Sequence, residues 1–180
     1  MPSTLGASPF CKTATRRDPE LWKTLECEVT AAQTFKVGDW VQKDSAGTLA
    51  IAATTGNNVD SSAVQLFGIA DANAADILAL DAGRRLCPVW VPLPGAQFLA
   101  PVYHATTASA VLAQTDVDGA AGPQILPLRN QGGIWCLGLA EDGTDDVVAI
   151  MERDQTYPWS ETFGTFWCSI IPAGLYSTPT

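Results

Sequence analysis

The chain has 180 residues, of which 47% are hydrophobic and only 16% are charged. This length suits one domain, or one domain with extended arms, and argues against two large independent cores. Its 10 Lys and Arg residues stand against 19 Asp and Glu, and the resulting net charge of −9 disfavours binding to the phosphates of nucleic acids.

Residues 1–30 are predicted to form an extended N-terminal arm. The first ten mix Pro, Ser and Gly with isolated apolar residues and have neither helical nor strand periodicity. Arg16 and Arg17 make the arm locally basic. An Asp-Pro start favours a short helix over residues 18–26, whereas residues 27–30 alternate like a strand, so both alternatives stay open.

Residues 31–153 are predicted to form the core, a mainly β structure that is a sandwich or barrel of short antiparallel strands. Apolar residues alternate on both sides of residues 44–47, which predicts two strands joined by a tight turn. Asp44 can accept the N–H groups that follow it, and Gly47 can take a positive φ without steric cost. This hairpin is the first element of the core.

Two more strands are predicted at residues 64–70 and 86–93. Between them, residues 71–83 fit one or two helical turns or a bulged connection. Pro88 and Pro92 cannot donate ladder hydrogen bonds, so we expect the second strand at a sheet edge or at a bulge. By their place in alternating strands, Trp40 and Trp90 should both face inward.

Three glycine-punctuated segments follow one another within residues 35–103. They read Gly-Asp-x-Val at 38–41, Phe-Gly-Ile-Ala at 67–70 and Val-x-Val-x-Leu-Pro-Gly-x-x-Phe at 89–98. In this order they resemble the capsid decoration (cement) proteins of tailed bacteriophages. The resemblance implies a small β-sandwich or barrel that docks on the outside of an assembled head, and it implies no catalytic residue.

The second half of the core echoes the first. Residues 136–141 repeat the pattern of residues 66–71, and residues 100–103, with 110–113 after them, resemble residues 38–41 with 48–51 after them. Two repeated four-strand units would bury each other's apolar faces in one sandwich. The alternative is that short strands containing glycine look alike by chance.

Residues 154–180 form a predicted aromatic C-terminal extension, with six aromatic side chains and no Lys or Arg. Such a segment must pack on its own domain or on a partner. We expect the two arms to supply most of the binding affinity for a partner, because aromatic and Arg side chains are typical binding hot spots. The candidate partner-binding residues are Phe10, Arg16, Arg17, Trp22, Trp159, Phe163, Phe166 and Trp167.

Signals for catalysis or for metal and cofactor binding are weak. His104 is the only histidine, and its expected role is structural or at the surface. The acidic residues 141–146 lack the spacing of a calcium loop and favour a solvated turn. Five cysteines without a Cys-x-x-Cys pair predict reduced thiols. We therefore expect no enzymatic activity, no metal and no cofactor.

The sequence predicts a structural virion protein that is made in the host cytoplasm and bound to the capsid exterior. Its expected partners are the major capsid protein and further copies of itself, with no nucleic acid and no membrane. The alternatives are another virion component, such as a head-fibre base or neck adaptor, and a small hydrolase that uses His104.

Overall fold

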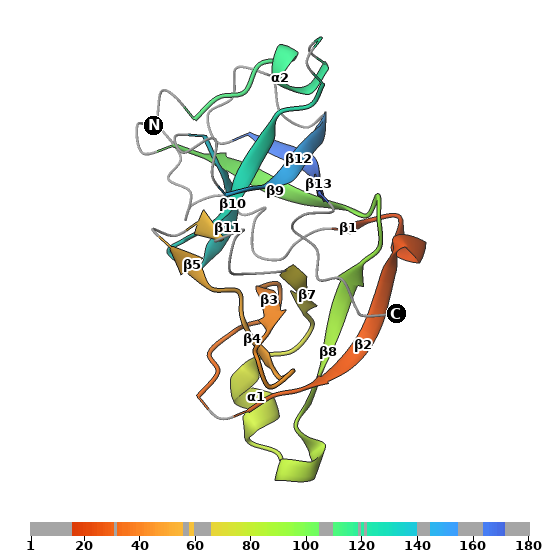
Figure 1. Ribbon diagram of the computed structural model, residues 1–180, viewed down its shortest axis with the longest axis vertical. Coiled ribbons are helices and arrows are strands. Elements are labelled where there is room, and N and C mark those ends of the chain that lie inside the picture. The colour runs from red at the N-terminus through yellow and green to blue at the C-terminus, as the bar shows by residue number, and fades with distance from the viewer. Residues whose placement is uncertain are drawn as a thin grey trace.

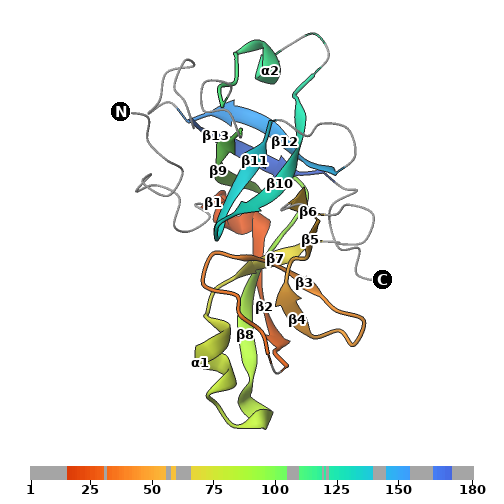
Figure 2. The same cartoon turned by 90° about the vertical axis from the view of Figure 1, so that its left-hand side faces the viewer.

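The computed structural model describes residues 16–30, 32–55, 58–59, 66–104, 110–118, 120, 122–139, 145–154 and 164–171. Strands dominate these residues and form two sheets at opposite ends of an elongated molecule (Figures 1 and 2). The mainly β prediction is confirmed. The strands are β1 (Arg16–Arg17), β2 (Trp22–Glu28), β3 (Trp40–Lys43), β4 (Leu49–Ile51), β5 (Thr54–Thr55), β6 (Asn58–Val59), β7 (Leu66–Ala70), β8 (Leu86–Pro92), β9 (Gln97–Tyr103), β10 (Ile125–Gln131), β11 (Ile134–Gly138), β12 (Asp146–Arg153) and β13 (Thr165–Ile170). The helical elements are η2 (Pro19–Leu21), α1 (Ala74–Leu78), η3 (Ala82–Arg84) and α2 (Thr115–Asp118).

The predicted hairpin is present as β3 and β4, which pair antiparallel in the five-stranded sheet β2-β8-β7-β3-β4. Asp44 Oδ1 accepts the N–H groups of Ala46 and Thr48, both at 2.9 Å, and Oδ2 accepts the Thr48 hydroxyl at 2.6 Å. These hydrogen bonds, led by that from the Thr48 side chain, lower the pKa of Asp44. Gly47 has a φ of 80°, as the turn requires.

The five-stranded sheet curls toward a closed barrel. Directly after β2, Val29 forms a parallel bridge with Leu49 of β4 at the far edge of the sheet. Its N–H also donates to the carbonyl oxygen of Arg85 at 2.9 Å. The interior is a cluster of buried apolar residues that α1 helps to cover. Its members include Phe35, Val41, Leu49, Phe67, Ile77, Cys87 and Val89.

β8 is an interior strand between β2 and β7, so the expectation of an edge position is wrong. Alternate residues of an antiparallel strand direct their N–H and C=O groups to the same neighbour. The carbonyl oxygen of Pro88 accepts the Asp71 N–H at 2.9 Å, so Pro88 and Pro92 both face β7. The β7–β8 ladder covers only the two pairs formed by residues 69–70 and 89–90. Pro88 and Pro92, which have no backbone N–H to donate, therefore lie beyond the ends of this ladder.

The second sheet has eight strands in the order β1-β9-β13-β12-β10-β6-β5, with β11 paired to β10 and in parallel to β9. Its apolar face packs against the outer face of the five-stranded sheet. Trp135 of β11 donates its indole N–H to Asp39 Oδ1 at 2.9 Å across this junction. Trp40 is fully buried there, as predicted, whereas Trp90 is only partly buried.

The predicted repeat is not reflected in the strand pairing. β7 has two antiparallel neighbours, β3 and β8, whereas β11 has one antiparallel and one parallel neighbour. β3 pairs with β4, but residues 110–113, which the repeat equates with β4, are not in a strand. The similarity between the two halves is one of short apolar segments and not of topology.

The arms are part of the sheets wherever the structure describes them. The helix considered for residues 18–26 is limited to η2, and the strand β2 begins at Trp22. β2 pairs with β8 over seven residues, and β13 lies between β9 and β12. Residues 16–28 and 165–170 thus complete the core, so the boundaries expected at residues 30 and 153 do not separate the described arms from it.

Candidate partner-binding site

Three of the eight candidate residues, Arg16, Arg17 and Trp22, lie where a two-stranded ribbon passes from one sheet to the other. β1 pairs with β9 in the eight-stranded sheet, and β2 pairs with β8 in the five-stranded sheet. Both strands of this ribbon bend at the same place, since Leu93 N donates to Leu21 O at 2.8 Å. Strands that switch sheets need such a bend. We call this region the corner, and it comprises β1, η2, the start of β2, the end of β8 and the start of β9.

The bend requires unusual backbone conformations on both strands of the ribbon. Asp18 has a φ of 54° just before η2, and Leu21 N donates to Asp18 O at 2.9 Å. On the other strand, Gly95 has a φ of 86°, which glycine adopts at low cost. Residues 94–95, the Pro-Gly of the segment 89–98 that resembles decoration proteins, thus form the turn that directs β9 into the second sheet.

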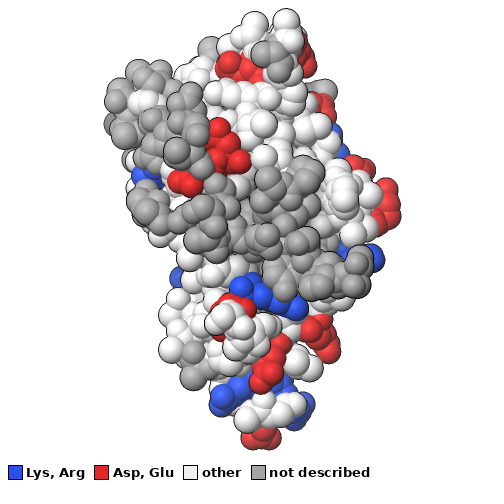
Figure 3. Space-filling view, viewed as in Figure 1, with Lys and Arg blue, Asp and Glu red and all other residues white. Residues whose placement is uncertain are grey.

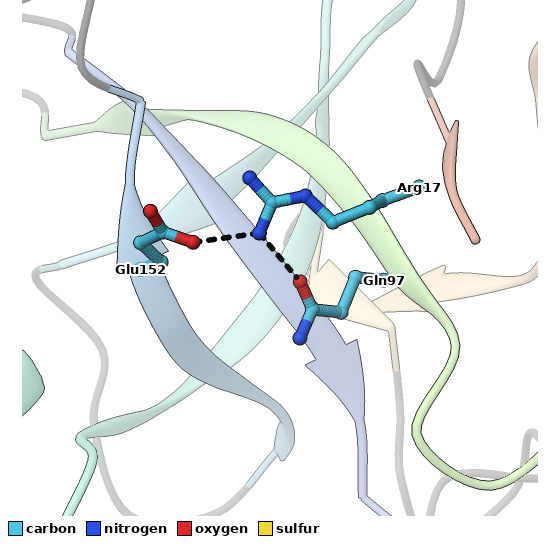
Figure 4. Close-up of polar contacts among 3 residues, drawn as sticks. All are labelled: Arg17, Gln97 and Glu152. Atoms are coloured by element: carbon cyan, nitrogen blue, oxygen red, sulfur yellow. Dashed lines mark hydrogen bonds and ion pairs between the residues drawn. The ribbon is translucent and has the colours of Figure 1, made fainter.

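Arg17 points over the face of the eight-stranded sheet (Figure 4). Its Nη1 donates to Glu152 Oε2 at 2.6 Å and to Gln97 Oε1 at 3.3 Å. Its guanidinium carbon also lies 4.3 Å from the ring centroid of Trp167, in a cation–π contact. Four strands, β1, β9, β13 and β12, contribute to this group, and its positive charge is paired.

Arg16 stacks on a different tryptophan. Its Cζ lies 3.5 Å from the ring centroid of Trp90 and 5.8 Å from that of Trp22. Burial lowers the pKa of the guanidinium, whereas the negative charge of Asp71 acts in the opposite direction. Arg16 Nη1 and Trp90 Nε1 are both buried and have no hydrogen-bond acceptor in the described part of the chain.

Trp22 and Phe166 serve the core, so their predicted role as exposed anchors is not the one that the structure gives them. Trp22 is 5% exposed, and its indole N–H donates to Arg17 O at 3.1 Å. Phe166 is 3% exposed on the inner face of β13. Trp167, the next residue, points to the opposite face and stays partly exposed. The remaining candidates, Phe10, Trp159 and Phe163, lie outside the described residues.

Sequence reasoning did not single out three residues that lie in the corner or contact it. Gln97 and Glu152 bind Arg17 from positions 80 and 135 residues away, and nothing local in the sequence signals these contacts. The alternating pattern predicts that Trp90 faces the core, yet its ring stacks against Arg16. A Trp between two prolines in an otherwise aliphatic strand was the available signal.

A hollow lies beside α1, with a volume of about 520 Å³ and a wide opening. Two of its polar side chains bond to each other, because Asn73 donates to Asp76 Oδ2 at 2.8 Å, and Asn73 also accepts the Val37 N–H at 3.2 Å. An open hollow of this kind is a weak candidate for a ligand site. The corner is therefore the stronger candidate.

The other predicted features give no chemical site. His104 directly follows β9 and is partly buried, and residues 141–144 of the acidic segment lie outside the described part. Over the described residues, no three His, Cys, Asp or Glu side chains are arranged to hold a metal ion, and no helix is long and apolar enough to cross a bilayer. Comparison with known proteins found no matching family model, no matching curated sequence and no matching solved structure.

Proposed function

We propose that this chain is a non-enzymatic capsid decoration protein that binds the outer surface of a bacteriophage head and stabilises it. The observation that supports the proposal is the placement of the three segments that resemble such proteins. They form β3, β7 and the β8–β9 ribbon, and β7 lies between β3 and β8 in one sheet. Segments scattered over 60 residues thus make one structural unit.

The glycine of the Phe-Gly-Ile-Ala segment has a specific role in this unit. A Cβ atom on Gly68 would lie 2.4 Å from the carbonyl oxygen of Trp90 and 2.7 Å from Cγ1 of Val89. Real Cβ atoms do not approach a backbone oxygen so closely, so only glycine lets β7 lie against β8. The motif therefore carries a packing requirement and is not an incidental run of small residues.

The surface is suited to extensive contact with a protein partner. Charged side chains form small groups between uncharged areas on the described part of the face in Figure 3. Six large apolar side chains of the described residues are 39–44% exposed. Leu25, Val37, Leu80 and Leu86 belong to the half of the molecule built on the five-stranded sheet, and Ile125 and Met151 belong to the eight-stranded sheet. Apolar groups of this kind supply the hydrophobic part of an interface.

Stabilisation would follow from mass action, because a protein that binds the assembled shell better than separate subunits favours the shell. An interface of about 800 Å² on each partner would give on the order of 10 kcal/mol before ordering costs are subtracted. Because many copies bind to one head, even a modest net binding free energy per copy stabilises the shell. In this proposal the partner is the major capsid protein, with adjacent copies of the chain as a further contact.

The test is a reconstitution of heads that lack this protein. Purified chain is added to such heads, unbound chain is removed by sedimentation, and the particles are imaged and heated. We expect density at many equivalent positions on the head exterior and a higher temperature of head disruption. Density confined to the neck or to fibre attachment points would contradict the proposal and favour the alternative virion component. Failure to sediment with heads at all would also contradict it.

A further inference from the structure

Two buried cysteines lie directly opposite each other on neighbouring strands. Cys27 of β2 and Cys87 of β8 are register partners in the antiparallel ladder that joins these strands (Figure 1). Partners of this kind place their side chains on the same face of a sheet, and both cysteines belong to the buried cluster inside the five-stranded sheet. Both are free thiols. The other two described cysteines, Cys136 and Cys168, have no cysteine among their register partners.

The hydrogen-bond pattern of the ladder sets the spacing of the pair. Pro88 faces β7, so Cys87 directs its N–H and C=O groups to β2 and forms a hydrogen-bonded pair with Cys27. The bond from Val29 N to Arg85 O at 2.9 Å, two residues further along, fits this alternation. Cα atoms in such a pair are about 5.5 Å apart, within the roughly 4.4–6.8 Å that a disulfide spans.

Closing a disulfide here requires only a small shift. Cβ atoms lie about 4.5–5.5 Å apart in a ladder and about 3.5–4.5 Å apart across a disulfide, so they must approach by about 1 Å. β2 ends the strand order of its sheet, and such a strand is held by one neighbour instead of two. The two thiols are already close, because the pKa of Cys87 is raised mainly by burial and also by the charge of Cys27.

The two thiols differ in access and in their electrostatic surroundings. Cys27 is 6% exposed, whereas Cys87 is 0% exposed. Burial raises the pKa of both, but the positive charge of Lys43 acts in the opposite direction on Cys27. Because the thiolate is the reactive form of cysteine, Cys27 is the thiol that reacts first and Cys87 the one that completes the bond.

We propose that Cys27 and Cys87 form an oxidation site at which hydrogen peroxide closes a disulfide that clamps β2 to β8. The Cys27 sulfur attacks one peroxide oxygen, the O–O bond breaks, hydroxide leaves, and the sulfur becomes a sulfenic acid. Cys87 then attacks this sulfur, so that the S–S bond forms and the S–O bond breaks. Two thiols and one peroxide thus give one disulfide and two waters. This site is independent of the proposed function.

The bond would tie together segments that are far apart in the chain. The loop that it closes contains the strands from β3 to β7 and the helix α1. Cross-linking so long a loop restricts the unfolded chain and therefore stabilises the folded one. Peroxide suits the site because it is small and uncharged, whereas a bulky disulfide reagent would have to displace more of β2 to reach a thiol that is 6% exposed.

The first experiment exposes the reduced full chain to a small molar excess of hydrogen peroxide in native buffer. Remaining thiols are alkylated in denaturant, and the chain is digested without reductant for mass spectrometry. We expect a loss of about 2 Da, the mass of two hydrogen atoms, and one linked peptide pair that contains Cys27 and Cys87. Cys136 and Cys168, both 0% exposed, should remain as free thiols. No linkage, linkage through other cysteines, or equal reaction of all four would overturn the site.

Single substitutions test the order of the reaction. In Cys87→Ala the sulfenic acid at Cys27 has no partner thiol, so we expect dimedone to trap it there. In Cys27→Ala, trapping at Cys87 should be slower, because this thiol is fully buried. Cys136→Ala is the matched control and should form the native linkage. Faster trapping at Cys87 than at Cys27 would overturn the assigned order.

The second experiment compares thermal unfolding of the oxidised and reduced chains by circular dichroism. We expect oxidation to raise the midpoint by about 5–15 °C, as for a disulfide that closes a long loop, and dithiothreitol to reverse the rise. The same treatment should raise the midpoint of Cys136→Ala but not that of Cys27→Ala. A linkage that leaves the midpoint of the native chain unchanged, or lowers it, would overturn the clamping role.

Discussion

Trp40 of β3 and Phe98 of β9 meet edge to face, with ring centroids 4.9 Å apart and planes at 69° to each other. The contact joins the two sheets, since β3 belongs to one and β9 to the other. Both rings are at most 1% exposed. Aromatic pairs in this arrangement contribute about 0.5–1.5 kcal/mol beyond the burial of their surface. The two halves of the molecule therefore share one core.

Trp40→Ala should lower the free energy of unfolding by about 3–5 kcal/mol, because it empties a fully buried site and removes the contact with Phe98. Urea denaturation followed by circular dichroism measures the change. Trp90→Ala is the matched comparison, since Trp90 is only partly buried, and we expect its cost to be smaller. A loss below about 1 kcal/mol for Trp40→Ala would contradict the shared core.

Gly68→Ala should prevent the close approach of β7 to β8, because the new Cβ would meet the Trp90 carbonyl oxygen at 2.4 Å. We expect a loss of more than about 2 kcal/mol or failure to fold, measured by thermal unfolding. Gly83→Ala is the control, since nothing lies within 4 Å of its Cβ position and its φ is not positive. That change should be neutral or stabilising by up to about 1 kcal/mol. Similar effects of the two changes would refute the packing role of Gly68.

Cys87 should make stability depend on alkaline pH. Burial raises the pKa of its thiol from 9.0 to about 11. The folded protein then holds the proton more tightly than the unfolded chain, so this contribution is complete below pH 9 and is lost as the pH rises to about 11. Urea denaturation at pH 8.5 and at pH 10.5 should show a steeper loss for the native chain than for Cys87→Ala, by on the order of 2 kcal/mol. Equal losses would contradict the raised pKa.

The Arg17–Glu152 ion pair should contribute little to stability despite its length of 2.6 Å. Its two side chains are 37% and 44% exposed, and water screens such pairs. We expect Glu152→Gln to cost about 0.2–1 kcal/mol at low salt and less in 1 M NaCl. Glu20→Gln, at an exposed position in η2, is the control and should cost nothing measurable. A cost above about 2 kcal/mol would mean that the pair is better shielded than its exposure indicates.

Removal of residues 154–180 should unfold the protein. The deletion takes away β13, which has five register pairs with each of its neighbours, β9 and β12. Their ladder groups and the apolar surface beneath Phe166 and Cys168 would be exposed. We expect aggregation or loss of cooperative unfolding, measured by circular dichroism and sedimentation. A shortened chain that melts cooperatively would show that these residues are a separable extension, as the sequence indicated.

The features that the sequence predicted well have local causes. The turn that Asp44 begins and the apolar segment at residues 66–70 depend on neighbouring residues, and both are present in the fold. The edge position predicted for β8 is wrong. Prolines such as Pro88 and Pro92 indicate a sheet edge, and only the observed pairing shows that both lie beyond the ladder with β7. Pairing of β8 with β2 joins residues about 60–70 positions apart, and no local pattern encodes it.

The candidate site was predictable by residue type and not by role. The sequence predicts Arg16, Arg17, Trp22 and Trp167 as binding anchors; the structure places the first three at the corner, and Trp167 of β13 contacts Arg17 from the neighbouring sheet strands. Arg17, Trp22 and Trp167 make contacts within the fold. Among the four, only Arg16 has a buried donor without an acceptor in the described part of the chain. Arg17 differs from Arg16 because Gln97 and Glu152 accept its hydrogen bonds, and these long-range contacts are evident only in the tertiary structure.

The ribbon that bends at the corner also has a consequence for translation. Trp22 lies opposite Pro92, so β2 leaves the ribosome about 70 residues before its partner does. Until β8 emerges, the nascent chain holds a strand with both edges open, and its Lys and Glu side chains help to keep it from pairing with other chains. Because such distant pairings form slowly, the strands made early are expected to be among the last to be fixed in place.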